Sequence, residues 1–159
     1  EEQRPVALVL SRQNIKSLPA LGASRREEAA QVAKGGYVVL DSAKPEVVMV
    51  ATGSEVSTLV EGAELLAAEG IAVRVVNVPS EGLFRDQPRS YQESVLPVGV
   101  VRYGLTSGLP VNLMGLVGEK GLIHGLDHFG YSAPYTVLDE KFGYNGILPA
   151  EEVKKLLGK

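Results

Sequence analysis

Apolar runs alternate along this chain with segments that have helical spacing. Val47–Ala51 is apolar throughout, which is typical of a strand buried on both faces of a sheet. The segment that follows places its apolar residues at helical spacing from Val56 to Ala67, and its glutamates lie off that stripe. Gly70 ends the pattern. The alternation predicts a strand followed by an amphipathic helix.

The same pattern continues on both sides of this unit. Three further strands are predicted at Tyr37–Leu40, Ile71–Val78 and Val98–Tyr103. Ser24 and Glu27 have the spacing of a capping box for a short helix that Gly35 would end. Later helices are predicted at Ser90–Leu96, from Pro134 to Phe142 with Gly143 as its stop, and at Pro149–Leu157. This order predicts an α/β fold: a three-layer domain with a mostly parallel, or mixed, sheet between helices.

The first residues suggest a second unit. Val6–Leu10 is another continuous apolar run, and we expect a strand buried on both faces. Ser17–Ser24 contains Pro19 and Gly22 and is typical of a linker. The chain starts without Met and enters this run at once. We therefore expect it to be part of a longer protein, with a processed terminus as the alternative.

Composition narrows the classes of function. The chain has 159 residues, a net charge of −3 and no cysteine. Its length suits one compact domain with a short tail, and its charge argues against a nucleic-acid-binding protein. Without cysteine it can form no disulfide. A cytoplasmic location is the default, with a secreted protein that lacks cysteine as the alternative. The chain has no apolar run near the roughly 18 residues of a membrane span, so we expect no membrane contact.

The strongest candidate for chemistry follows the first apolar run. Ser11, Arg12 and Gln13 come at the expected carboxyl end of a strand, which is where ligands bind in open α/β sheets. The planar guanidinium of Arg12 suits phosphate oxygens. The residues alone leave a surface ion pair equally open.

Three other patterns are candidates for a metal site, an anion site and a catalytic serine. His124 and His128 have a metal-ligand spacing on a helix, but the glycines around them favour two polar loop histidines. Gly53-Ser54-Glu55 lies between a strand and a helix and is a candidate anion site, with Ser54 as a simple helix cap as the alternative. In Gly104–Gly108 the serine is one place out of register for a nucleophile elbow, so a serine hydrolase is disfavoured.

Six phrases in order carry a family resemblance. The chain resembles the last part of transketolase through Leu10–Asn14, Gly35–Val38, Ala51–Val56, Val73–Ser80, Tyr91–Pro97 and Phe129–Pro134. Leu10–Asn14 and Tyr91–Pro97 favour transketolase over its relatives, the 2-oxo-acid dehydrogenase β subunit and deoxyxylulose phosphate synthase. The resemblance implies that residues 1–19 end the pyrimidine-binding domain, 20–34 form a linker, and 35–159 form the carboxy-terminal domain.

The resemblance also implies an activity. Transketolases are homodimers that move a two-carbon ketol unit between sugar phosphates, with thiamine diphosphate and a divalent cation (magnesium or calcium). Arg12 matches the position that contacts the sugar phosphate. The family's Gly-Asp-Gly motif is missing from the sequence, and its cofactor-activating glutamate would lie upstream. We therefore expect no catalytic, cofactor or metal residue here, an inactive isolated segment, and a structural role in shaping the dimer.

One stretch departs from the family. Residues 102–116 stand where the family has an aromatic segment that includes a Trp, and this chain has no Trp. The resemblance therefore predicts no structure for this stretch. A free-standing α/β module that binds an anion or nucleotide at Gly53-Ser54-Glu55 is the alternative function.

Overall fold

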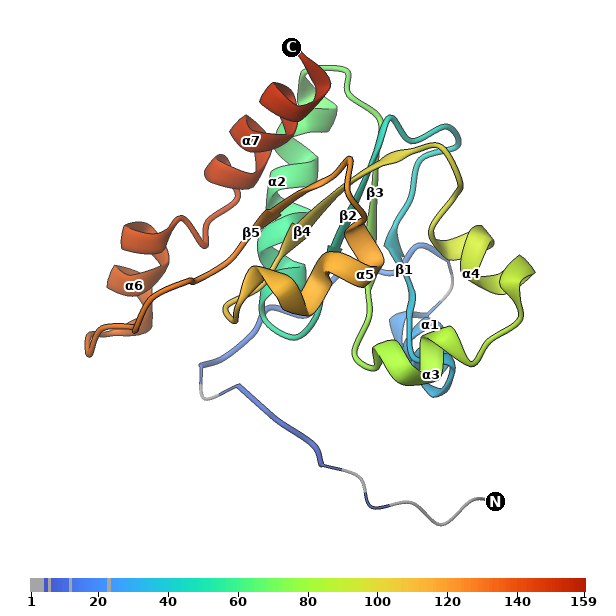
Figure 1. The fold of residues 1–159 in the computed structure, drawn as a ribbon, viewed down its shortest axis with the longest axis horizontal. Coiled ribbons are helices and arrows are strands. Elements are labelled where there is room, and N and C mark those ends of the chain that lie inside the picture. Colours follow the sequence, from blue (N-terminus) through green and yellow to red (C-terminus); the bar gives the residue numbers. More distant parts are fainter. Residues whose placement is uncertain (1–4, 6, 12, 23) are drawn as a thin grey trace.

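One mixed sheet forms the centre of the molecule (Figure 1). The computed structural model describes residues 5, 7–11, 13–22 and 24–159. Within that part of the chain, the sheet has five strands in the order β1-β3-β2-β4-β5. Their bounds are Tyr37–Leu40 for β1, Val47–Ala51 for β2, Val73–Asn77 for β3, Val101–Leu105 for β4 and Leu122–His124 for β5.

The pairing explains why the sheet is mixed. β1 runs antiparallel to β3, with Tyr37 opposite Asn77. β2 is parallel to both of its neighbours, so that Met49 pairs with Val75 on β3 and with Tyr103 on β4. β5 extends the sheet in parallel beyond β4. After β2 the chain crosses to β3 on one side of β2, and after β3 it crosses to β4 on the other side of β2. The gap between β2 and β4 is therefore the topological switch point of the sheet.

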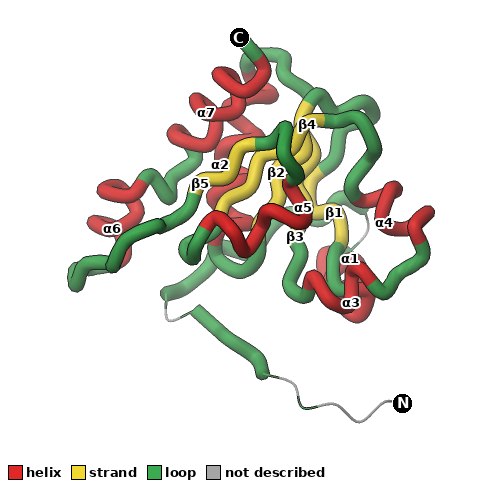
Figure 2. The backbone as a smooth tube through the Cα atoms, viewed as in Figure 1, coloured by secondary structure: helices red, strands yellow, loops and turns green. Residues whose placement is uncertain are grey.

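Helices cover both faces of the sheet, as Figure 2 shows. On one face, α2 (Glu55–Ala68) and α7 (Ile147–Leu157) pack over a core that includes Leu59, Leu66 and Val153. On the other face, a second core contains residues of α3 (Glu81–Arg85), α4 (Arg89–Val95) and α5 (Met114–Val117). The remaining helical segments are α1 (Arg25–Ala29), η1 (Ala30–Lys34), η2 (Pro110–Leu113) and α6 (Tyr135–Phe142). The predicted three-layer α/β fold is confirmed.

The central strand, β2, is completely buried. All five residues of β2 are fully buried, and their side chains divide between the two cores: Met49 joins one and Val48 the other. Burying an aliphatic side chain of this size contributes about 1.5–3 kcal/mol. Helix α7 comes close to α2 because Gly62 has no side chain: a Cβ there would lie 3.0 Å from the carbonyl of Gly146. No helix in the described part of the chain is long and apolar enough to cross a membrane.

The segment before the fold does not form the predicted strand. Among its described residues, Leu8, Val9 and Leu10 have no regular secondary structure and are 75–92% exposed. The prediction of a strand buried on both faces is wrong for this structure. A buried strand needs neighbours that supply hydrogen bonds and apolar cover, and the described residues place none beside this segment.

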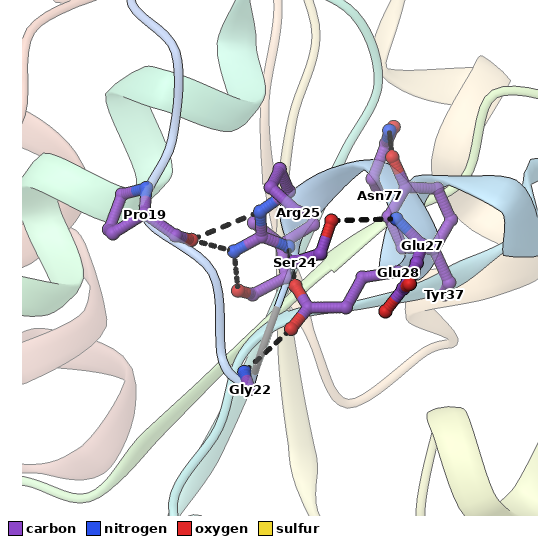
Figure 3. A network of polar contacts seen from close by, with 9 residues as sticks. Pro19, Gly22, Ser24, Arg25, Glu27, Glu28, Tyr37 and Asn77 are labelled. Carbon is purple, nitrogen blue, oxygen red and sulfur yellow. Dashed lines mark hydrogen bonds and ion pairs between the residues drawn. The ribbon is translucent and has the colours of Figure 1, made fainter.

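Hydrogen bonds join the predicted linker to β1. The Arg25 guanidinium donates to the carbonyl of Pro19 and, at 2.8 Å, to the carbonyl of Val39 (Figure 3). Arg25 also pairs with Glu28 at 2.9 Å, and Glu28 accepts the Gly22 amide at 2.7 Å. These bonds hold Pro19 and Gly22 beside the start of α1 and the first strand.

The stretch without a family prediction has a defined structure. β4 is followed by η2 and α5, and Leu113 and Leu116 of this stretch are buried in the second core, together with Val117 just after it. Gly104 of β4 lies where these side chains pack on the sheet: an added Cβ there would lie 2.8 Å from Cγ2 of Val117 and 3.1 Å from Cδ1 of Leu113. Residues 110–116 thus cover this face of the sheet with aliphatic side chains.

Candidate functional site

The residue predicted to bind the sugar phosphate, Arg12, lies outside the described residues. Its described neighbours are solvent-accessible: Ser11 is exposed and Gln13 is half-buried. Gln13 and Asn14 line a cavity of about 560 Å³ together with Ala133, Tyr135 and Leu138, from the start of α6. The segment that carries Arg12 therefore adjoins an open cavity at α6.

The second candidate, Gly53-Ser54-Glu55, lies at the switch point, between the carboxyl end of β2 and the start of α2. Ser54 occupies the N-cap position of α2, as the simple-cap alternative predicted, but its side chain makes no capping hydrogen bond. The Ser54 hydroxyl instead donates to Oε2 of Glu55 at 3.3 Å. A carboxylate thus lies beside the hydroxyl that would contact an anion.

Further acidic groups surround this point. The Tyr144 hydroxyl donates to the carbonyl of Thr106, after β4, at 2.8 Å. Burial, with the charges of Glu55 and Asp139, raises the pKa of Tyr144 to about 12. Burial and the charge of Glu55 likewise raise the pKa of Asp139. Negative charge gathered at the switch point disfavours a phosphate or nucleotide there.

A polar network joins the sheet to the last helix. The hydroxyl of Tyr103, a fully buried residue of β4, donates to Oε2 of Glu152 in α7 at 2.7 Å. Nδ1 of His124 in β5 lies 3.4 Å from Oε1 of the same carboxylate. Nε2 of His124 lies 2.8 Å from the carbonyl of Phe142, at the end of α6. Both ring nitrogens of His124 therefore face acceptors, an arrangement that suits the imidazolium.

The charges in this network stabilise one another. The hydrogen bond to Glu152 raises the pKa of His124, against the opposing effect of burial. Burial alone would raise the pKa of Glu152, but the hydrogen bonds from His124 and Tyr103 outweigh it and lower that pKa. Burial, and then the bond to Glu152, raises the pKa of Tyr103 well above its usual range. The network therefore consists of a charged pair, His124 and Glu152, and a buried neutral donor, the Tyr103 hydroxyl.

The two histidines do not form a metal site together. His124 belongs to β5 and the network above, whereas His128 is exposed and its Nδ1 lies 2.8 Å from the carbonyl of Phe129. Among the described residues, no group of three or more histidines, cysteines or carboxylates is placed to hold a metal ion. The described residues therefore include no cluster that fits a divalent cation.

Ser107, in the segment Gly104–Gly108 that partly resembles a nucleophile elbow, has no catalytic partner among the described residues. Ser107 is exposed in the loop after β4. The nearest histidine along the sequence, His124, already has both nitrogens opposite other acceptors. A serine hydrolase needs a histidine nitrogen within reach of the hydroxyl, and His124 does not provide one.

The comparison with known families decides the family of the chain. Residues 35–145 match the model described as the transketolase-like TK C-terminal domain. The chain belongs to this family. The match includes all five strands described above, and it extends through residues 102–116, for which the resemblance predicted no structure.

Individual relatives are transketolases. The plasmid-encoded transketolase of Cupriavidus necator is 42% identical over 98% of this chain, and transketolase 1 of Escherichia coli is 42% identical over 96%. The chain spans 23% of the length of each. A structure of Pichia stipitis transketolase in complex with sedoheptulose-7-phosphate superposes with a TM-score of 0.81 at 31% identity, and the match covers 92% of this chain and 20% of that one. The predicted resemblance to the carboxy-terminal part of transketolase is confirmed.

Sequence reasoning missed the polar network. The sequence predicts Tyr103 only as the end of a strand and Glu152 only as part of the helix Pro149–Leu157. The available signal was the tyrosine itself, because a buried Tyr needs a partner for its hydroxyl. Only the packing of α7 against the sheet identifies that partner as Glu152.

Proposed function

We propose that this chain works as the carboxy-terminal part of a transketolase, which transfers a two-carbon ketol unit from a ketose phosphate to an aldose phosphate. The observation that carries the proposal is 42% identity to a transketolase across 98% of the chain. Relatives in this family bind phosphorylated sugars: Pichia stipitis transketolase has been solved with sedoheptulose-7-phosphate and with xylulose-5-phosphate. In this proposal the enzyme is a cytoplasmic homodimer.

The proposed division of labour follows from the residues present. Thiamine diphosphate, with a divalent cation, would supply the chemistry. Both would be held by the part of the enzyme that corresponds to the other three-quarters of the relatives' length. Within this chain, residues 1–19 would end the pyrimidine-binding domain, 20–34 would form the linker and 35–159 the carboxy-terminal domain. Alone, the chain would be inactive.

Arg12 is the residue proposed to touch substrate. Its guanidinium would bind the phosphate at the end of the sugar remote from the reacting carbonyl. Such remote binding energy orients the reacting end without taking part in bond making. Ser11 and Gln13 would lie beside it and hold no proton in the reaction.

Exposed apolar residues support the existence of a covering partner. Leu8, Val9 and Leu10 are 75–92% exposed, and Phe129 is 97% exposed. A run of three exposed apolar residues such as Leu8–Leu10 is typical of a segment that lies in an interface. In the proposal, the rest of the transketolase chain covers the first segment and restores its strand.

A chimera tests the proposed function. In transketolase 1 of Escherichia coli, the aligned carboxy-terminal segment is replaced by this chain, and ketol transfer from xylulose 5-phosphate to ribose 5-phosphate is measured. The proposal predicts an active, cofactor-dependent enzyme. The unaltered relative is the control, and a soluble chimera that dimerises but transfers no ketol unit would contradict the proposal.

A further inference from the structure

A cavity of about 350 Å³ lies on the face of the sheet that α3, α4 and α5 cover. Arg85, Arg89 and Arg102 contribute to its lining, whereas Glu93 is the one carboxylate among the described lining residues. Its apolar part includes the buried side chains of Phe84, Leu96 and Leu116. This cavity lies in the second core layer, away from the segment that carries Arg12.

The charges of the three arginines are not balanced. Arg85 pairs with Glu81 at 2.6 Å and Arg89 pairs with Glu93 at 2.6 Å, but no ion pair in the described part of the chain includes Arg102. Arg102 is nevertheless half-buried, and burial lowers the pKa of its guanidinium. The wall of the cavity therefore carries one positive charge more than its paired carboxylates neutralise.

Two of the guanidinium groups converge on neighbouring residues of α5. Nη1 of Arg102 donates to the carbonyl of Leu116 at 2.6 Å, and Nη2 donates to the carbonyl of Leu96 at 3.3 Å. The Arg85 guanidinium lies against Gly115, where an added Cβ would clash with its Nη2 and would lie 2.8 Å from Oε1 of Glu81. Glu81 thus neutralises Arg85 at this point, whereas Arg102 has no carboxylate partner among the described residues, and a bound anion would supply the missing negative charge.

We propose that this cavity binds a phosphate group. Arginine forks match the oxygens of phosphate. Among the described residues, Nε of Arg102, Nη1 of Arg85 and both Nη atoms of Arg89 have no hydrogen-bond acceptor, so they remain available as donors. The apolar side of the cavity would receive the carbon skeleton of a phosphorylated metabolite, while free phosphate would use the arginines alone. The inference does not rest on the proposed function, because none of these residues belongs to the segment of Arg12.

Residue-resolved NMR tests the site. Amide shifts of the 159-residue Arg12→Ala chain, in which the proposed substrate anchor is removed, are followed during titration with inorganic phosphate, ribose 5-phosphate and ribose at constant ionic strength. We expect saturable shifts at Gln92 and Gly115 with both phosphates and none with ribose. Tighter binding of ribose 5-phosphate would assign the site to a phosphorylated metabolite, and equal binding would assign it to free phosphate.

Variants keep the test decisive. Arg102→Gln should weaken phosphate binding at least tenfold, but it also removes two bonds to backbone carbonyls and could unfold the region. Arg89→Gln, at a side chain that is 88% exposed, should weaken binding about threefold or more without affecting the fold. Arg26→Gln, an exposed arginine of α1, is the matched control and should change nothing. Linear shifts spread over the surface, or unchanged affinity in the Arg89 variant, would overturn the proposal.

Discussion

The hydroxyl of Tyr103 lies 2.7 Å from Oε2 of Glu152, so that one hydrogen bond joins a fully buried residue of strand β4 to helix α7. The same carboxylate faces His124 of β5. α7 is thus held to the sheet by an apolar face that includes Val153 and by a polar network beside it. A bond to a charged group in such a place is worth more than a surface ion pair.

Removing the Tyr103 hydroxyl should destabilise the fold. Tyr103→Phe leaves one oxygen of the partly buried Glu152 without its donor, and we expect the free energy of unfolding to fall by about 1.5–3 kcal/mol. Urea denaturation measures the change. Tyr135→Phe, at an exposed tyrosine of α6, is the matched control and should cost less than about 0.5 kcal/mol. Equal, small effects of both substitutions would mean that the bond contributes nothing to stability.

The pair of His124 and Glu152 should give stability a defined dependence on pH. The raised pKa of His124 means that its contribution is complete below about pH 6.5, the unfolded value, and is lost as the pH rises through the folded pKa. The lowered pKa of Glu152 means that its contribution is present above about pH 4.5 and is lost as the pH falls through the folded pKa. The pair therefore stabilises the fold most between these limits.

Single and double variants check this dependence. Unfolding free energies of the parent chain, His124→Gln, Glu152→Gln and the double variant are measured from pH 4 to pH 9. Each single variant should lose the stabilisation between about pH 4.5 and 6.5, and the double variant should lose little more than either one. A His124→Gln difference that does not vary with pH would show that the ring is not charged in the folded chain.

Two glycines should respond in opposite directions to alanine. Gly104→Ala places a methyl group 2.8 Å from Val117 and should destabilise the fold by about 1–3 kcal/mol. Gly82→Ala is in helix α3 with no atom within 4 Å of the added Cβ, and it should stabilise by about 0.5–1 kcal/mol. Thermal unfolding of both variants gives the sign. A neutral Gly104→Ala would mean that residues 113–117 do not pack tightly on the sheet.

Much of the fold was predictable because its strands are short and strongly apolar. Val47–Ala51 was predicted with the bounds that the structure gives, and the glycine stop at Gly143 is confirmed by its positive φ of 77°. The antiparallel direction of β1 was not predictable, because strand direction depends on how the chain crosses the sheet and not on local pattern. The boundaries of the domains at residues 19 and 34 stay a prediction.

The errors and omissions have a common physical cause. Val6–Leu10 has a buried strand's composition, but burial depends on neighbours that the described residues do not supply. Ser54 occupies the predicted cap position, yet its hydroxyl bonds to Glu55. His124 and Glu152 are 28 positions apart, so that only packing brings them together. Local pattern identifies elements, and contacts between distant elements decide what their polar side chains do.

Arg12 offers a test of the substrate anchor. In the chimera, Arg12→Ala should raise KM for phosphorylated sugars by roughly 10- to 100-fold, since the loss of a charged hydrogen bond costs about 1.5–3 kcal/mol. Unphosphorylated sugars should be affected far less, because they have no group for the guanidinium to bind. Steady-state kinetics with ribose 5-phosphate and ribose as acceptors measure the two effects. Equal losses for both substrates would remove Arg12 from the phosphate site.

The most direct test of the central claim is ketol transfer by three samples assayed side by side with thiamine diphosphate and magnesium. The samples are the 159-residue chain alone, the Escherichia coli relative truncated before the aligned segment, and the chimera that joins the two. The account predicts turnover by the chimera and none above background by this chain alone. Turnover of ketose phosphates by the isolated chain would contradict it.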